Sequence, residues 1–137
     1  MTSRSKDRTS SQTPMPTAAE VDILAALWRL GAATVREVHD ALRKDCGYNT
    51  TLKQMQLMMD KGLLVRTERF GAHVYESGVP MQQMQTRIAG DLMRRVFGGS
   101  TKQMVLGALD AKSASKEELA EIREIVEALE KKKRGSK

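Results

Sequence analysis

The sequence predicts a mostly helical fold that carries one small β-hairpin. Its composition supports the helical part, because aromatic residues make up only 4% of the chain and nine methionines accompany its Leu, Val, Ile and Ala residues. Two helical patterns between Val35 and Lys61 then run directly into two short alternating segments separated by a turn. This order of helix, helix, strand and strand predicts a winged helix-turn-helix domain, followed by a helical region.

Length and local composition suggest how the chain is divided. A chain of 137 residues has room for one modest core or for two small packed units. Residues 1–16 are polar, contain two prolines and show no hydrophobic period, so we expect a disordered basic tail. We assign residues 17–79 to the winged-helix domain, 81–132 to a C-terminal helical dimerisation domain and 133–137 to a disordered basic end.

Two capping boxes mark the starts of the first two predicted helices. Thr17 and Glu20 begin a helix that runs to about Leu30, where Gly31 stops it. Thr34 and Glu37 begin the second helix, which ends near residues 46–47. The apolar residues that we expect to be buried are Val21, Leu24, Leu27 and Trp28 in the first helix and Val35, Val38, Ala41 and Leu42 in the second.

The third predicted helix spans Thr50–Lys61, with Asn49 as its N-cap and Gly62 just past its end. Its apolar face, which we interpret as core, consists of Leu52, Met55, Met58 and Met59. The other faces carry short hydroxyls, amides, cations and one aliphatic side chain, which suit base edges, thymine methyls and phosphates in a major groove. These outer residues are Thr50, Thr51, Lys53, Gln54, Leu57 and Lys61. For Leu57 we favour the core or a domain contact over a thymine methyl.

The alternating segments after this helix predict a hairpin. Leu63–Arg69 and Ala72–Ser77 are the two strands, and Gly71 supplies the turn conformation between them. After Pro80 the helical period returns until Gly98 and Gly99. Ser100 can cap a short helix that runs to about Ala111, and Ser115 with Glu118 can cap a final one.

The C-terminal helices carry apolar stripes that need a partner. The stripe of the last helix covers about two heptads, which are too few for an independent coiled coil, so a second copy of the chain is the simplest partner. The candidate dimerisation residues are Met84, Ile88, Leu92, Val96, Leu106, Leu119, Ile122, Val126 and Leu129.

Several functional classes find no support in the sequence. Cys46 is the single cysteine, so an internal disulfide is excluded, and we interpret it as structural rather than redox-sensing. The two histidines lie on separate predicted elements, and no phosphate loop, nucleophile elbow or carboxylate dyad is present. We therefore expect no enzyme, no metal site and no cofactor. Since the chain has no long apolar run and no signal-peptide pattern, we expect a cytoplasmic protein without membrane insertion.

The charge of the chain is compatible with nucleic-acid binding but does not establish it. The formal net charge is +6, yet residues 36–69 contain seven basic and five acidic residues. The functional prediction therefore rests on the pattern of elements and not on electrostatics.

Four segments resemble the penicillinase-repressor family (the BlaI/MecI/CopY type), in order and over about residues 17–130. They are Gly47–Leu52, Lys61–Arg66, Ala72–Tyr75 and Phe97–Ser100. Members of this family are homodimeric winged-helix repressors that bind palindromic double-stranded DNA operators and dimerise through C-terminal helices. The resemblance implies that the helix after Tyr48 enters the major groove and that the wing touches the DNA backbone or the minor groove. The residues implied are Asn49, Thr50, Thr51, Lys53 and Gln54 in the helix and Arg66, Arg69 and His73 in the wing.

The sequence departs from the family pattern at three places. The family often has two threonines where this chain has Lys53 and Gln54, and a basic residue at Leu57, so the operator sequence cannot be inherited from relatives. The Cys-rich metal site of copper-responsive members is missing, which argues against direct metal sensing. Antibiotic-responsive members are inactivated when a membrane-bound sensor protease, or a protease it activates, cuts the C-terminal region. Residues 106–109 are apolar as in that region but lack the polar residue expected before the cut.

Two further functions are alternatives to a DNA-binding repressor. A winged helix can serve as a protein-interaction module, which the modest charge of the domain and Leu57 favour. A small-molecule-gated regulator would need a pocket between the domain and the C-terminal helices, for which the sequence offers no recognisable chemistry. Steep salt dependence of nucleic-acid binding would count against the interaction module, because neutralising several phosphates releases counterions.

Overall fold

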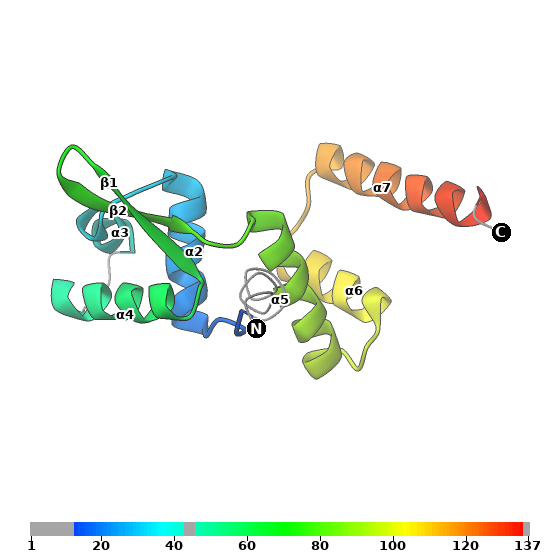
Figure 1. Cartoon of the computed structure of the whole chain (residues 1–137). Coiled ribbons are helices and arrows are strands. Elements are labelled where there is room, and N and C mark those ends of the chain that lie inside the picture. The colour runs from blue at the N-terminus through cyan, green and yellow to red at the C-terminus, as the bar shows by residue number, and fades with distance from the viewer. Residues whose placement is uncertain (1–12, 43–45, 136–137) are drawn as a thin grey trace. The chain divides into compact units, whose positions relative to one another are not determined.

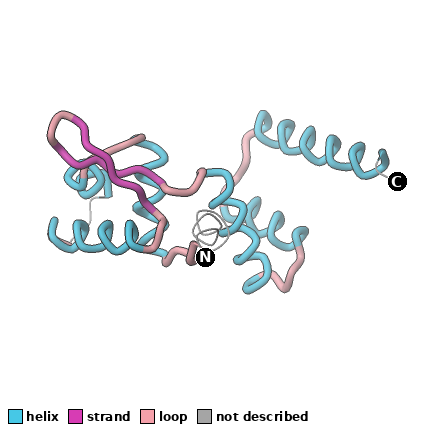
Figure 2. Tube along the Cα trace, in the orientation of Figure 1, coloured by secondary structure: helices cyan, strands magenta, loops and turns pink. Residues whose placement is uncertain are grey.

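The computed structural model describes residues 13–42 and 46–135, and within them the predicted order of helices and strands is confirmed (Figure 1). Three helices are followed by an antiparallel hairpin, drawn in magenta in Figure 2, and then by three more helices. The elements are α2 Ala18–Leu30, α3 Val35–Leu42, α4 Tyr48–Asp60, β1 Leu64–Arg69, β2 Ala72–Ser77, α5 Met81–Val96, α6 Thr101–Ala111 and α7 Lys116–Gly135.

The chain divides into two compact units between Gly90 and Asp91. This division falls inside α5, whereas the sequence suggested a boundary at Pro80. Helix α5 therefore begins in the first unit and ends in the second. The predicted N-terminal tail lies outside the described residues except for residues 13–16, and the predicted basic end is described only as far as Gly135. No helix in residues 13–42 or 46–135 is long and apolar enough to cross a bilayer.

Both predicted capping boxes form. The Thr17 amide donates to Glu20 Oε1 at 3.0 Å, and the Glu20 amide donates back to Thr17 Oγ1 at 3.2 Å. At the start of α3, the Thr34 amide donates to Glu37 Oε1 at 2.9 Å and the Glu37 amide to Thr34 Oγ1 at 3.1 Å. Each box satisfies backbone donors that the first helical turn leaves free.

Helix α4 begins earlier than the sequence predicted. Gly47 is its N-cap, no side chain caps it, and Asn49 is an exposed residue inside the first turn, so the prediction of Asn49 as N-cap is wrong. The helix gains Tyr48 and Asn49 at its start. The centroid of the Tyr48 ring lies 4.3 Å from the Arg36 guanidinium carbon, and the ring is edge-on to His39. These contacts with α3 draw Tyr48 into the helix, and they could not be read from local capping signals.

The end of α4 follows the prediction. Gly62 adopts a φ of +87°, a left-handed conformation that glycine tolerates best. The Gly62 amide donates to the Met59 carbonyl at 3.1 Å and the Leu63 amide to the Met58 carbonyl at 2.9 Å. This pair of hydrogen bonds is a Schellman motif, which turns the chain from α4 directly into the hairpin.

The hairpin is anchored to the helices at two places. Residues 64–69 pair with residues 77–72, and the extra bridge between Ala33 and Tyr75 ties the hairpin to the segment before α3. At the base of the hairpin, the Gly78 amide donates to the Leu63 carbonyl at 2.8 Å. A Cβ at position 78 would lie 2.7 Å from the Gly62 carbonyl oxygen, so only glycine fits this close approach.

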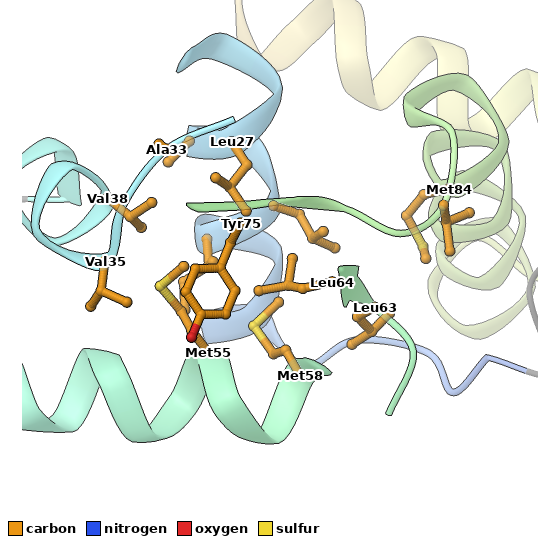
Figure 3. Packing of buried hydrophobic residues seen from close by; sticks show 14 residues of the cluster. Leu27, Ala33, Val35, Val38, Met55, Met58, Leu63, Leu64, Tyr75 and Met84 are labelled. Carbon is orange, nitrogen blue, oxygen red and sulfur yellow. The ribbon is translucent and has the colours of Figure 1, made fainter. Parts of the chain in front are cut away.

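The hydrophobic core of the first unit joins α2, α3, α4 and the hairpin (Figure 3). The Tyr75 ring extends from β2 toward α4 and lies beside Met55. Because α3, α4 and β2 all contact α2, the buried face of α2 is wider than a single stripe. It includes Ile23 and Ala26 as well as the predicted Leu24 and Leu27. The predicted Val21 and Trp28 are only half-buried, at the margin of this face.

Met84 and Ile88 of α5 also belong to this core. Met84 is fully buried, and Ile88 packs against the same cluster. The predicted role of Met84 in dimerisation is therefore wrong, because a fully buried side chain cannot meet a second copy, whereas the half-buried Ile88 is partly used within the chain. The four-residue spacing identified an apolar face of α5 correctly, but it could not tell that the first half of that face is used within the chain.

Within its described residues, the second unit contains no buried side chain. Ser100 Oγ accepts from the Gln103 amide at 3.1 Å and Ser115 Oγ accepts from the Glu118 amide at 3.0 Å, as the capping signals predicted. Eight large apolar residues of this unit are exposed by 40–62%; they are Leu92, Val96, Val105, Leu106, Leu119, Ile125, Val126 and Leu129. Such a set of uncovered apolar side chains is unusual for a unit that works alone.

Candidate nucleic-acid interface

The outward side of α4 carries four of the predicted DNA-contact residues. Asn49, Thr50 and Lys53 are exposed, and Gln54 is half-buried. Leu57 is 54% exposed on the same helix, so the interpretation that it completes the core is wrong. The exposed side of α4 thus presents an amide, a hydroxyl, an ammonium and an aliphatic group, all of which have partners on base edges or phosphates.

Thr51 does not share this side, and its predicted place on the outer surface is wrong. It is 1% exposed, and its Oγ1 lies 2.7 Å from His39 Nδ1 and 3.9 Å from Cys46 Sγ. Helix α3 packs against α4 at this point, and the buried inner face of α4 consists of Thr51, Met55 and Met58. A threonine fits there because the imidazole satisfies its hydroxyl. Thr51 therefore positions α4 on α3 and cannot reach a base.

Lys61 is also used inside the domain. Its Nζ donates to Glu20 Oε2 at 2.6 Å, and the Glu20 side chain is only 5% exposed. Burial by itself raises the pKa of Glu20, but the hydrogen bonds from Lys61 and Thr17 and the Lys61 charge outweigh it and lower that pKa. The ion pair joins the start of α2 to the end of α4, so the structure offers a structural role for Lys61 in place of a DNA contact.

A cleft of about 270 Å³ separates the recognition-helix candidate α4 from the hairpin. Cationic side chains reach it from two directions, Arg36 from the first turn of α3 and Arg66 from β1, with His73 beside them on β2. Among the described residues, no carboxylate lines the cleft; the other lining residues are Thr34, Val35, Tyr48, Leu52, Gln56, Ala72 and Tyr75. A concave, partly apolar surface with two guanidinium groups and no carboxylate favours a phosphate group.

The hairpin residues predicted to touch DNA do not all share this cleft. Arg66 and His73 lie on one face of the hairpin, since their positions alternate with those of the other face. Arg69 lies on the other face, where its guanidinium is 3.8 Å from Glu37 Oε1. Glu37 also caps α3, so Arg69 is held against the domain at a depression that Glu37 and Asp40 line.

Arg36 is the residue that the sequence interpretation missed. It occupies the first turn of α3, where the positive end of the helix dipole disfavours a cation. An arginine in the first turn of a helix contributes nothing to helix stability. Its unfavourable position in the sequence of α3 was therefore the signal that could have indicated a functional role. The ring of Tyr48 lies 4.3 Å from the guanidinium carbon and holds Arg36 at the edge of the cleft.

In residues 13–42 and 46–135, no three His, Cys, Asp or Glu side chains gather into a group that could hold a metal ion. His39, next to Thr51 and Tyr48, is occupied in packing α3 against α4.

Comparison with known proteins places most of the chain in a protein family. The sequence profile described as Penicillinase repressor matches residues 16–128. Among solved structures, a MarR family protein from Bacillus stearothermophilus aligns with a TM-score of 0.48 and 16% identity over 97% of this chain and 84% of its own. The Giardia lamblia Hop2-Mnd1 complex aligns with a TM-score of 0.34 and 22% identity over 85% of this chain and 83% of its own.

No curated protein matches the sequence. The profile match nevertheless spans most of the chain, including the winged-helix unit, α5, α6 and most of α7. The chain belongs to the penicillinase-repressor family, and it is a winged-helix transcriptional regulator rather than an enzyme.

Proposed function

We propose that this protein is a homodimeric, sequence-specific repressor that reads a palindromic operator with α4 in the major groove. The observation that carries the proposal is the surface where the exposed side of α4 meets the carboxylate-free cleft. Base-reading groups and phosphate-binding groups lie next to each other on it, which is the arrangement that a helix inserted in the major groove requires.

In this proposal, α4 selects the bases. Lys53 suits guanine O6 and N7, Gln54 suits adenine N6 and N7, and Leu57 suits a thymine methyl. Asn49 and Thr50 lie in the first turn of α4, closest to where the helix would meet the groove floor or a phosphate. Thr51 contributes indirectly, by fixing α4 on α3 through His39.

Affinity comes from the cleft. Arg36 and Arg66 would bind one backbone phosphate between them, with His73 at its edge. A phosphate held there lies between the recognition helix and the wing, so it also fixes the register of α4 along the groove. We do not assign Lys61 or Arg69 to the DNA, because each pairs with a carboxylate of the domain.

Dimerisation is supported by the second unit. Its described residues expose a row of apolar side chains on α7, and a second copy of the same surface is the simplest cover for them. The dimerisation residues retained from the sequence prediction are Leu92, Val96, Leu106, Leu119, Ile122, Val126 and Leu129. Two α4 helices related by a two-fold axis would read half-sites roughly 34 Å apart, or a multiple of that.

Relief of repression by a sensor protease is a prediction from the family resemblance alone. The residues in question, 106–109, lie within α6. A protease can cut an extended chain but not an intact helix, so cleavage there needs local opening of α6.

The proposal is tested by selecting bound sequences from a random duplex pool with the full-length protein. We expect enrichment of an inverted repeat, because two identical reading units follow the symmetry of the dimer. Enrichment of a single half-site would support base recognition by α4 but contradict binding as a dimer. No enrichment at low salt by a demonstrably folded protein would overturn the proposal.

One observation favours a different function. Leu57 is 54% exposed on α4, and an exposed aliphatic residue on a recognition helix also suits a protein partner. The two functions differ in salt dependence, because several phosphate contacts make log K fall steeply with log[salt]. A flat salt dependence of nucleic-acid binding would favour the interaction module.

A further inference from the structure

The tip of the hairpin presents an aromatic ring to solvent. Phe70 is 101% exposed, so nothing in the described part of the chain covers it. The residue and its neighbour Gly71 form a two-residue turn in which φ is +53° at Phe70 and +80° at Gly71. Phe70 is the only non-glycine residue with a positive φ within residues 13–42 and 46–135.

Neither property of Phe70 helps the domain to fold. A bulky side chain at positive φ crowds the backbone, and two-residue turns with two positive φ values prefer Asn or Asp before Gly. A fully exposed phenyl ring also gains nothing from burial. Unfavourable backbone geometry and an uncovered aromatic ring at one residue indicate a use outside the domain.

The residues around Phe70 indicate which surface it would meet. At the tip itself the charges balance, because Glu68 lies opposite His73 in the hairpin and Arg69 pairs with Glu37, whereas Arg66 and His73 line the cleft at the base of the same hairpin. Because the tip extends from a cleft that Arg36 and Arg66 line, a partner that places a phosphate in the cleft also reaches Phe70, which argues for nucleic acid over an apolar protein pocket. The hairpin is also at its narrowest at a two-residue turn, and a minor groove is only about 6 Å wide.

We propose that Phe70 is an apolar wedge that enters the minor groove beside the base pairs read by α4 and partly unstacks one base step. This inference rests on the proposed function, since it needs α4 to bind DNA. Apolar side chains that enter minor grooves separate base steps in this way, and Phe is one of those used. The ring then gains the burial that it lacks in the free protein.

The wedge adds a sequence preference that α4 does not supply. Pyrimidine–purine steps such as TA and CA are the easiest to unstack. We therefore expect the operator to carry such a step at the position of the hairpin tip, outside the bases contacted by α4. This preference would be selected by deformability and not by hydrogen bonds to base edges.

Two variants of the full-length protein separate the wedge from the turn. Phe70→Asn places a favoured residue before Gly71, so the melting temperature should stay the same or rise by a few degrees, about 2–5 °C. Affinity for the selected operator should nevertheless fall roughly 5- to 100-fold, the range typical of a lost aromatic contact with a base. Phe70→Leu keeps an apolar wedge and should bind more tightly than Phe70→Asn.

A spectroscopic reading follows the base step directly. With 2-aminopurine at the expected pyrimidine–purine step, wild-type protein should raise the fluorescence by unstacking the base, and Phe70→Asn should not. Random-pool selection with Phe70→Asn should keep the α4-contacted bases and lose the preference for this step.

The outcomes distinguish the two proposals. If wild-type protein selects no DNA, the proposed function fails. If wild-type and Phe70→Asn bind the operator equally and give the same 2-aminopurine signal, only the wedge is overturned. A loss of dimerisation by Phe70→Asn in sedimentation, with no change at the base step, would assign the ring to a contact between copies and would also overturn the wedge.

Discussion

Thr50 and Thr51 are adjacent residues with opposite surroundings. Thr50 is exposed, and Thr51 is buried against His39. Thr51→Val keeps the shape but removes the hydroxyl, so the free energy of unfolding should fall by about 1–2 kcal/mol. Thr50→Val should change that free energy by less than about 0.5 kcal/mol and should weaken operator binding. Denaturant unfolding and DNA titration of both variants check this.

The pair of threonines is its own control, because the substitution is identical and only the surroundings differ. Equal losses of stability would contradict the burial of Thr51. Unchanged operator binding by Thr50→Val would remove that hydroxyl from the proposed interface.

The Glu20–Lys61 ion pair makes a pH-dependent contribution to stability. Since the folded-state pKa of Glu20 is below its ordinary value of 4.5, the contribution is present above that value and is lost as pH falls through the folded-state pKa. Lys61→Met removes the hydrogen bond to a nearly buried carboxylate while solvent screens part of the charge, so we expect a loss of about 1 kcal/mol at pH 7.

The difference between wild type and Lys61→Met should shrink as the pH falls through the folded-state pKa of Glu20, which lies below 4.5, because Glu20 then becomes protonated in the folded wild type as well. Unfolding by urea between pH 7 and pH 3 measures this. Lys102→Met, at an exposed position of α6, is the matched control and should show little change. A difference that did not shrink as the pH was lowered over this range would assign the effect to packing of the lysine stem.

For single residues, the sequence was sufficient to predict roles that depend on neighbours close along the chain. Thr17, Glu20, Thr34 and Glu37 act over three residues, so the pattern was sufficient. Thr51 was placed on the wrong face, and the pairing of Lys61 and Arg69 was not anticipated, because the partners are far along the chain, at His39, Glu20 and Glu37. A contact over twelve or more residues has no local signature.

Helix α4 and the cleft should affect DNA binding in different ways. Lys53→Ala should weaken binding to the operator more than to random DNA, because the ammonium contacts bases in the proposed complex. Arg36→Ala should weaken both similarly and reduce the slope of log K against log[salt] by about 0.9, the value for one phosphate. Titrations at several salt concentrations measure both effects.

Arg29→Ala on α2 is a suitable control for charge, since Arg29 is exposed and does not line the cleft. It should leave the salt slope and the specificity unchanged. Equal effects of Lys53→Ala on operator and random DNA would mean that Lys53 binds a phosphate.

The elements themselves were largely predictable, while their buried faces were not. Helix ends and the hairpin follow from Gly62, Gly71 and the capping residues, which act locally. The buried face of α4 is centred on Thr51, Met55 and Met58 because α3 and α2 pack there. The hydrophobic pattern correctly identified Met55 and Met58, and Leu52 and Met59 pack at the margin of that face. It missed Thr51, since it cannot represent a buried, hydrogen-bonded threonine.

For the whole molecule, the uncovered apolar residues of the second unit predict that dimerisation depends on α6 and α7. A truncation that ends at Gly99 retains the winged-helix unit and all of α5. It should be folded and monomeric and should bind the operator weakly, because the two half-sites are no longer bound together. Sedimentation equilibrium and circular dichroism check its mass and its fold.

A truncated protein that still sediments as a dimer would contradict the proposed dimerisation surface. Full-length Val126→Asp places a charge in the exposed apolar row of α7 and gives a second test without truncation. It should weaken the dimer and leave the melting of the first unit unchanged.

The division of the chain was harder to predict than its elements. Pro80 looked like a domain boundary because the period changes from strand to helix there. The packing of Met84 and Ile88 instead extends the first unit into α5. Which part of a helix is covered within the chain depends on tertiary contacts, and these are not encoded in the spacing of its apolar residues.

The anchoring of the hairpin at Ala33–Tyr75 and at Gly78 has a mechanical consequence. Tyr75 of β2 is hydrogen-bonded to Ala33 before α3, and Leu63 at the base of the hairpin is hydrogen-bonded to Met58 of α4, so we expect the separation of α4 and the wing to change little on the double helix. When the protein surface is rigid, the DNA must deform to fit it. We therefore expect the nucleic acid to supply the curvature of the complex, and closely related operators to differ in affinity according to how readily they bend.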